Sequence, residues 1–348
     1  MGLGPLMIDI AGLALDDRDR ELLRHPLVGG VILFSRNYED PAQLAALTAS
    51  IHALRSPPLL VAVDHEGGRV QRFRSGFSLL PPLRRIGHEF DMEPRQGLLM
   101  ARRMAWLMAA ELRAVGIDFS FAPCVDLDYG VSEIIGDRAF HSRADSVAQL
   151  AVAYLQGMRE AGMAGTAKHF PGHGAVVADS HLALPVDRRE LADLEADLAP
   201  YRRLIANELP AIMMAHVLFP AVDAVPASFS RRWVTEFLRG ELLFKGVVFA
   251  DDLSMAGAEA VGGVVDRARA ALDAGCDILP VCNNRASVMK LLDGLPVKPG
   301  PASQLRILRM RGKEAPDRRA LLASATHAEC RDWLARCGRP PELRLDQG

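Results

Sequence analysis

The chain has 348 residues, 49% of them hydrophobic and 24% charged, a composition typical of folded globular proteins and not of disordered or fibrous ones. Its 41 Lys and Arg residues nearly balance its 43 Asp and Glu residues, so the formal net charge is −2. This balance gives no overall attraction to nucleic acid or to an anionic membrane, and we expect neither as a partner.

The five cysteines are widely scattered and include no C-x-x-C pair, which argues against a disulfide scaffold and against a zinc finger. The apolar N-terminal segment lacks a basic leader and carries Asp9, so it predicts a buried strand and not a signal peptide. No run approaches the ~18 apolar residues of a membrane-spanning helix. We therefore expect a cytoplasmic protein in a reducing compartment.

Short apolar segments, many of them β-branched, alternate with longer segments of helical periodicity. The short segments predict strands at 5–10, 28–34, 58–63, 117–123, 163–170, 210–217, 245–252 and 276–281. The longer segments predict helices at 17–25, 41–54, about 95–115 and about 146–161, and helical sequence follows each of the last four strands. Asp40 as N-cap and Pro41 at the first helical position favour a helix start there.

Eight strands, each followed by a helix, indicate an α/β fold: a single-domain TIM-type (β/α)8 barrel over residues 1–295, with active-site loops at the C-terminal ends of the strands. A doubly wound open sheet is the alternative, but no strand is followed by the G-x-G-x-x-G of dinucleotide-binding folds. Residues 296–348 begin with the turn-rich PVKPGPASQ, and we expect them to form a C-terminal helical tail packed on the barrel.

Polar residues follow the predicted strands, at the end of a barrel where active sites lie. They are Asp64 and Arg72 after the third strand, Asp126, Asp128 and Arg138 after the fourth, Lys168 and His169 at the end of the fifth, His216 at the end of the sixth, and Asp251 and Asp252 at the end of the seventh. Each alone is consistent with a solvated loop residue, and His216 with a packing role. Their recurrence at five strand ends favours a site.

The segment KHFPGHGAVVADSH at 168–181 carries His and Asp residues that raise the alternative of a metal site. Its Pro and Gly residues disfavour the helix that would align two imidazoles on a metal. In an extended loop Asp179 and His181 lie on the same side, where the carboxylate would orient a proton-transferring imidazole. With Asp251 as a carboxylate nucleophile, this pair suits retaining glycoside hydrolysis.

Four motifs together resemble family 3 glycoside hydrolases, and among them the bacterial β-N-acetylhexosaminidases of the NagZ type. They are VDHEGGRVQR (63–72), GDRAF (136–140), KHFPGHGAVVADSH (168–181) and FADDLSM (249–255). The resemblance spans about residues 5–295 and supports the barrel fold. It departs from the family at Ala250, where Ser is more common before the nucleophile; because a small residue is retained, we expect only an adjusted hydrogen bond there.

The resemblance implies a role for each matching residue. Asp251 is expected to be the nucleophile, with Asp179 and His181 as the acid/base pair. The residues expected to bind the sugar are Asp64, Arg72, Arg138, Lys168 and His169. No cofactor or metal is implied.

The resemblance also implies the substrate, terminal N-acetylglucosamine on 1,6-anhydro-N-acetylmuramic acid and its peptides, cleaved in the cytoplasm during peptidoglycan recycling. We expect a monomer whose partner is this small molecule. Two alternatives stay open at this point: a metal-dependent barrel hydrolase and a non-catalytic sugar-binding barrel.

Overall fold

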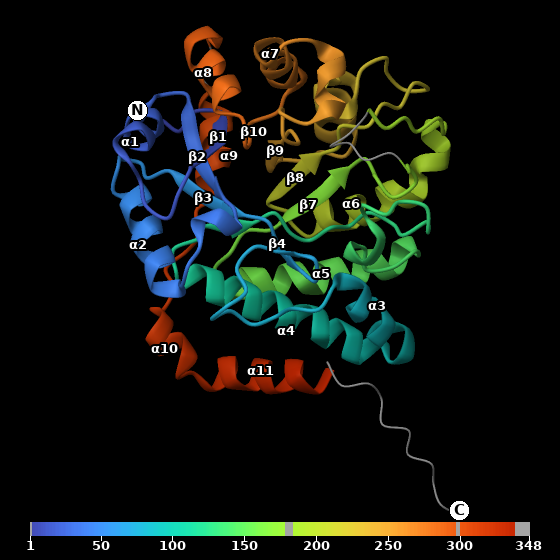
Figure 1. Ribbon diagram of the computed structural model, residues 1–348. Coiled ribbons are helices and arrows are strands. Elements are labelled where there is room, and N and C mark those ends of the chain that lie inside the picture. The colour runs from blue at the N-terminus through green and yellow to red at the C-terminus, as the bar shows by residue number, and fades with distance from the viewer. Residues whose placement is uncertain (1, 178–183, 297–299, 338–348) are drawn as a thin grey trace, which may run out of the picture.

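The computed structural model describes residues 2–177, 184–296 and 300–337, and a closed parallel barrel lies at its centre (Figure 1). The barrel strands are β1 (Leu6–Asp9), β2 (Val28–Leu33), β3 (Leu60–Val63), β6 (Phe119–Ser120), β7 (Thr166–Phe170), β8 (Ala211–Met214), β9 (Val247–Phe249) and β10 (Leu279–Val281). They pair in the order β10-β1-β2-β3-β6 and β7-β8-β9. Parallel bridges from Phe119 to Ala164 and from Phe249 to Ile278 join the two sheets, which confirms the predicted fold class.

Helices surround the strands on all sides of the barrel in Figure 1. They are α1 (Asp17–Arg24), α2 (Pro41–His52), α3 (Leu83–Met92), α4 (Pro94–Arg113), α5 (Ala144–Glu160), α6 (Glu195–Ala206), the π-helix η5 (Arg232–Glu241), α7 (Val264–Ala274) and α8 (Arg285–Gly294). Short 3-10 helices are η1 (Ser35–Asn37), η2 (Gly136–Arg138), η3 (Leu191–Leu194), η4 (Ala227–Phe229) and η6 (Ala256–Val261). As predicted, Asp40 caps α2, accepting from the backbone N–H groups of Ala42 and Gln43 at 2.7 and 2.9 Å.

Aromatic rings fill the interior of the barrel. The ring of Phe119 in β6 lies 5.7 Å from that of Phe249 in β9, centroid to centroid, although β7 and β8 separate these strands in the sheet order. Phe121 packs edge-on against both rings, at 5.3 and 5.2 Å. All three side chains are buried, so the barrel has a packed core below its C-terminal end.

The connection between β3 and α4, for which the sequence predicted neither a strand nor a helix, contains both. An antiparallel hairpin of β4 (His65–Gly67) and β5 (Val70–Gln71) follows β3 directly, and α3 precedes α4. The two glycines of the hairpin turn, Gly67 and Gly68, have φ of 111° and 56°, values that side chains with a Cβ rarely adopt. The first two candidate site residues, Asp64 and Arg72, flank this hairpin.

Three helices follow the barrel: α9 (Pro301–Leu308), α10 (Arg318–Leu322) and α11 (Ala325–Cys337). Helix α9 lies at the N-terminal end of the barrel, because Ser303 and Arg306 both hydrogen-bond to Asp277, just before β10. Helices α10 and α11 pack along α4 (Figure 1). The tail therefore contacts the barrel at two places.

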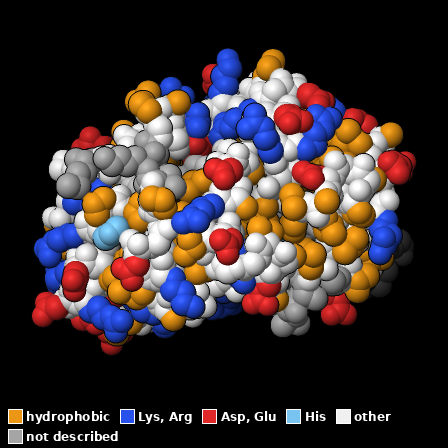
Figure 2. All heavy atoms as spheres, turned by 90° about the horizontal axis from the view of Figure 1, so that it is seen from above, with side chains coloured by type: hydrophobic (Ala, Val, Ile, Leu, Met, Phe, Trp, Pro, Cys, Tyr) orange, Lys and Arg blue, Asp and Glu red, His pale blue; other side chains and the backbone are white. Residues whose placement is uncertain are grey.

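The face over α7 and α8 carries cationic and anionic side chains interspersed with apolar ones, and neither sign dominates it (Figure 2). This mixture agrees with the near-zero net charge of the sequence. Among the helices in the described part of the chain, none combines the length and the apolar character needed to cross a bilayer.

Candidate active site

A cavity of about 300 Å³ opens at the C-terminal ends of the strands. Its lining includes all six predicted site residues that the structure describes: Asp64, Arg72, Arg138, Lys168, His169 and Asp251. They come from the β3 end, the β4–β5 hairpin, η2, β7 and the segment after β9. The structure thus brings together residues that are up to 187 positions apart in the sequence, in a volume at the lower end of the range for small-molecule sites.

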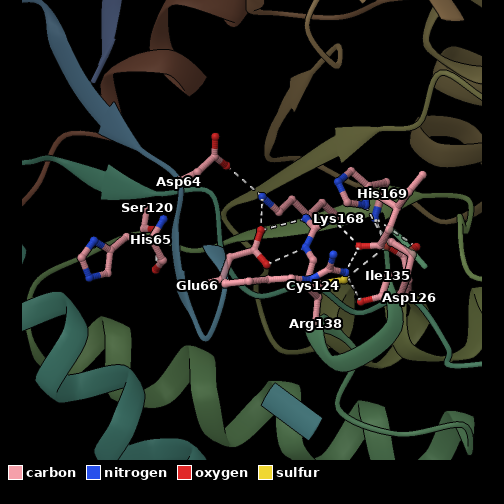
Figure 3. Close-up of polar contacts among 12 residues, drawn as sticks. Asp64, His65, Glu66, Ser120, Cys124, Asp126, Ile135, Arg138, Lys168 and His169 are labelled. Atoms are coloured by element: carbon pink, nitrogen blue, oxygen red, sulfur yellow. Dashed lines mark hydrogen bonds and ion pairs between the residues drawn. The ribbon is translucent and has the colours of Figure 1, made fainter. Parts of the chain in front are cut away.

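Two cations and two carboxylates form a connected network in this cavity (Figure 3). The Lys168 Nζ lies 3.0 Å from Asp64 Oδ1 and 2.6 Å from Glu66 Oε1. Arg138 donates through Nε and Nη2 to the two oxygens of Glu66, each at 2.9 Å. Arg72 lies further away, with its Nη2 3.9 Å from Asp64 Oδ2. Asp64 and Arg72 are the more exposed members, so their polar groups are accessible from the cavity.

Sequence reasoning missed Glu66 as a site residue. Burial by itself would raise the pKa of this carboxyl group, but Arg138 and Lys168 outweigh burial and hold the pKa well below its usual range. For the Lys168 ammonium, burial by itself would lower the pKa, but the carboxylates of Glu66 and Asp64 outweigh burial and raise it. The available signal was spacing: Glu66 stands two residues after Asp64, a separation that favours the same side of an extended chain.

A bulge in β7 explains how two successive residues, Lys168 and His169, line the same cavity. The pairing of β7 with β8 shifts register between Lys168 and Phe170, so the regular alternation of side chains is interrupted there. Alternation alone would direct only one of the two neighbours toward the barrel mouth. The sequence shows the residues but not the bulge.

Asp126 fixes the orientation of His169. Its carboxylate accepts from His169 Nδ1 at 2.7 Å and from the backbone N–H groups of His169 and His173, the latter at 2.8 Å. Burial would raise the pKa of Asp126, but His169 and then His173 lower it to about 2. Asp126 followed a predicted strand, yet its positioning role could not be read from the sequence because its partners lie 43 and 47 residues away.

Asp251 and Asp252 differ in their surroundings although both line the cavity. The Oδ1 of Asp252 accepts from Ser254 Oγ at 2.7 Å and from the Cys282 N–H at 3.1 Å, so this carboxylate ties its own loop to the end of β10. The Oδ1 of Asp251 accepts from the Asp252 N–H at 2.9 Å. His216 stacks on Phe229 with ring centroids 5.1 Å apart, in agreement with a packing role.

The predicted acid/base residues Asp179 and His181 lie outside the described residues. The described part of their loop reaches residue 177, and within it His173 is buried at the cavity. Burial, followed by His169, lowers the pKa of His173, which favours its neutral form. The roles of Asp179 and His181 therefore remain predictions.

Cys124, Asp126 and His169 form a grouping with ligand spacing for a metal ion in the described part of the chain. Its polar atoms already form hydrogen bonds with one another: Cys124 Sγ and His169 Nδ1 both hydrogen-bond to Asp126 Oδ2. Burial, followed by the charge of Asp126, raises the pKa of the Cys124 thiol far above its usual value, which suits its role as a hydrogen-bond donor to Asp126. These contacts fit hydrogen bonding better than metal binding.

Comparisons with known proteins agree with this barrel and its site. The model of the glycosyl hydrolase family 3 N terminal domain matches residues 6–309. A beta-hexosaminidase from Thiobacillus denitrificans is 55% identical over 343 residues, which cover 97% of this chain and 95% of the relative. The chain belongs to glycosyl hydrolase family 3.

Solved structures show which members of this family the chain is similar to. NagZ from Neisseria gonorrhoeae in complex with N-trifluoroacetyl-D-glucosamine superposes with a TM-score of 0.92 at 42% identity, covering 97% of this chain and 99% of that one. NagZ from the same organism in complex with a zinc ion has a TM-score of 0.91 at 40% identity, with the same coverages. The enzyme is a β-hexosaminidase with a NagZ-like fold, which excludes the alternative of a non-catalytic barrel.

Proposed function

We propose that the enzyme is an exo-acting, retaining β-N-acetylglucosaminidase that removes terminal N-acetylglucosamine from 1,6-anhydro-N-acetylmuramic acid and its peptides in peptidoglycan recycling. The observation that carries the proposal is the convergence of Asp251 and five polar binding residues on one cavity of about 300 Å³. A cytoplasmic location and a monomeric state belong to the same proposal. The glucosamine derivative bound by the gonococcal enzyme supports the sugar assignment.

In this mechanism Asp251 attacks the anomeric carbon and forms a covalent glycosyl ester while the bond to the leaving oxygen breaks. His181, oriented by Asp179, donates its proton to that oxygen. It then takes a proton from the water that attacks the ester, which frees Asp251 and restores the protonated imidazole. Two successive displacements leave the sugar product in the β configuration.

The network around Lys168 suits recognition of sugar hydroxyl groups. Asp64 accepts hydrogen bonds, whereas Arg72, Arg138 and Lys168 only donate them, so together they match hydroxyls that do both. Glu66 holds Arg138 and Lys168 in place through contacts of 2.6 to 2.9 Å before any sugar binds. Fixed donors and acceptors of this kind favour one orientation of one ring.

The decisive experiment compares hydrolysis of an aryl β-N-acetylglucosaminide with that of the matching β-glucoside and β-N-acetylgalactosaminide. We expect strong preference for the first substrate, and NMR at early times should show the β anomer of the product. Early appearance of the α anomer would reject the covalent intermediate. Equal rates on all three aryl glycosides would reject the sugar assignment.

A metal-dependent hydrolase is the second candidate, because the structure has a grouping with metal-ligand spacing and a similar protein has been solved with zinc. We expect full activity after prolonged incubation with excess EDTA. Loss of activity that added zinc restores would favour the metal mechanism instead.

The anhydro-disaccharide, assayed beside the aryl substrate, tests the link to peptidoglycan.

A further inference from the structure

The C-terminal helices connect to the candidate site through a buried pair of side chains. His327 in α11 lies with Nε2 2.9 Å from Oε1 of Glu111 in α4. The two side chains are 3% and 4% exposed. An ionisable pair buried this far from solvent is costly unless each member is held by further partners.

The further partner of Glu111 is the segment between β5 and α3. The carboxylate accepts from the backbone N–H of Ser78 and from Ser78 Oγ, each at 2.8 Å. Both oxygens of Glu111 are used, one of them shared with His327. The position of Ser78 thus depends on a carboxylate that α11 helps to fix.

Gln71 continues the connection from Ser78 to the cavity. Its side-chain amide donates to the carbonyl of Ser78 at 2.9 Å, and its side-chain oxygen accepts from the Leu80 N–H at 3.0 Å. Gln71 is buried, and the next residue in the chain is Arg72, whose side chain lines the cavity facing Asp64.

A second contact ties the tail to the same segment. The guanidinium of Arg318, in α10, lies 5.1 Å from the ring centroid of Phe77 and donates to the carbonyl of Gly76. The tail therefore holds the 72–80 segment at two neighbouring points, Gly76–Phe77 and Ser78. Neither His327 nor Arg318 lines the cavity; Arg318 contacts that segment directly, and His327 contacts the carboxylate that holds Ser78.

We propose that α10 and α11 act as a positioning element for substrate binding, in which His327 holds the 72–80 segment, through Glu111, so that Arg72 faces the sugar. This inference rests on the proposed function only in taking Arg72 as a sugar-binding residue. Because hydrogen-bond geometry at a binding site tolerates displacements of only about 0.5 Å, a released segment weakens binding without removing any binding group.

The test is a double-mutant cycle in the full chain, with KM and kcat measured on the aryl β-N-acetylglucosaminide. We expect His327→Ala to raise KM about 2- to 30-fold, the range of modest energetic coupling between sites, with little change in kcat. His327→Gln, whose amide can still donate to Glu111, should restore much of the loss. Arg331→Ala, at an exposed position of the same helix, is the matched control.

Adding His327→Ala to Arg72→Ala should raise KM no further, because the group through which His327 acts is then already absent. Independent, multiplying effects would overturn the proposal, as would an unchanged KM in His327→Ala. Arg72→Ala without any effect on KM would instead reject the binding role of Arg72 and, with it, this route. If His327→Ala folds poorly, as judged by its melting temperature, Arg318→Ala provides the same cycle through Gly76 and Phe77.

Discussion

Both ends of the barrel bury charged side chains, but the two ends use them differently. At the N-terminal end Asp277 accepts from the Val248 N–H in β9 at 2.9 Å, and from Arg239 and Arg306 at 2.8 and 2.6 Å. Asp118 is similar, accepting from the Val61 N–H in β3 at 2.8 Å. Each carboxylate, just before a strand, clamps the strand beside it and is surrounded by donors.

At the C-terminal end the paired charges border a cavity. Lys168 is as buried as Asp277, but its partner Asp64 is 23% exposed and Arg72 is 34% exposed. The network there is held on one side by Glu66 and left accessible on the other. Burial of charge alone therefore does not identify a site, whereas a buried charge that faces an accessible cavity does.

The largest effect should come from Asp251→Ala. In the proposed mechanism no glycosyl ester forms without Asp251, so we expect kcat on the aryl substrate to fall about 10⁴-fold or more, with the unfolding free energy nearly unchanged. Steady-state kinetics beside a thermal melt measures both. Asp251→Asn, which keeps the shape and removes the charge, should be as inactive. A variant that retained a tenth of the activity would show that the nucleophile lies elsewhere.

The next effect depends on the leaving group. An aryl oxide departs without protonation, so His181→Ala should slow cleavage of the anhydro-disaccharide about 10²- to 10⁴-fold and the aryl substrate far less. Asp179→Ala should give a weaker version of the same pattern, since in the proposed mechanism Asp179 orients the imidazole. The ratio of the two rates is the measurement. Equal losses on both substrates, or rescue by zinc, would remove His181 from the acid/base role.

Asp277→Ala tests the N-terminal end. Its removal takes charge-assisted hydrogen bonds away from the partly buried Arg239 and Arg306, and each such bond contributes roughly 1.5 to 3 kcal/mol to the unfolding free energy. Urea unfolding should show this loss while KM stays within error at a temperature where the variant is folded. Asp273→Ala, in α7 and outside this network, serves as control. A raised KM with unchanged stability would contradict a purely structural role for the buried charges at the N-terminal end.

Sequence alone predicted the barrel because its signals are local: apolar strand segments alternate with amphipathic helices, and the turn residues are recognisable. It missed the β4–β5 hairpin, since strands of three and two residues carry almost no periodic pattern. Six predicted site residues line one cavity because strand ends converge in this fold. Glu66 and the hydrogen bond from His327 to Glu111 were missed because both depend on contacts between distant segments. Glu66 contacts Arg138, 72 residues away, and His327 contacts Glu111, 216 residues away.

The smallest expected effect is a pH dependence of the unfolding free energy, and it comes from His65, a buried histidine in β4, directly after β3. His65, packed against Phe73 and Phe77 with ring centroids 5.9 Å apart, has its pKa lowered to about 3 by burial and, secondarily, by Arg72 and Arg74. In the unfolded chain a histidine has a pKa of about 6.5. Between these two values the unfolded state binds a proton that the folded state does not, so stability is fully present above about pH 6.5 and falls as the pH drops toward 3.

From pH 7.5 to 5 this histidine alone should remove about 2 kcal/mol of unfolding free energy, because the slope approaches about 1.4 kcal/mol per pH unit once the histidine of the unfolded chain is protonated. Urea unfolding at pH 7.5, 6 and 5 measures the slope, and His65→Phe, which cannot take up a proton, should flatten it. His88→Gln, an exposed histidine on α3, should keep the slope of the parent enzyme. If His65→Phe and the parent enzyme lost stability in parallel, the acid sensitivity would have to arise elsewhere than at the end of the barrel that holds the cavity.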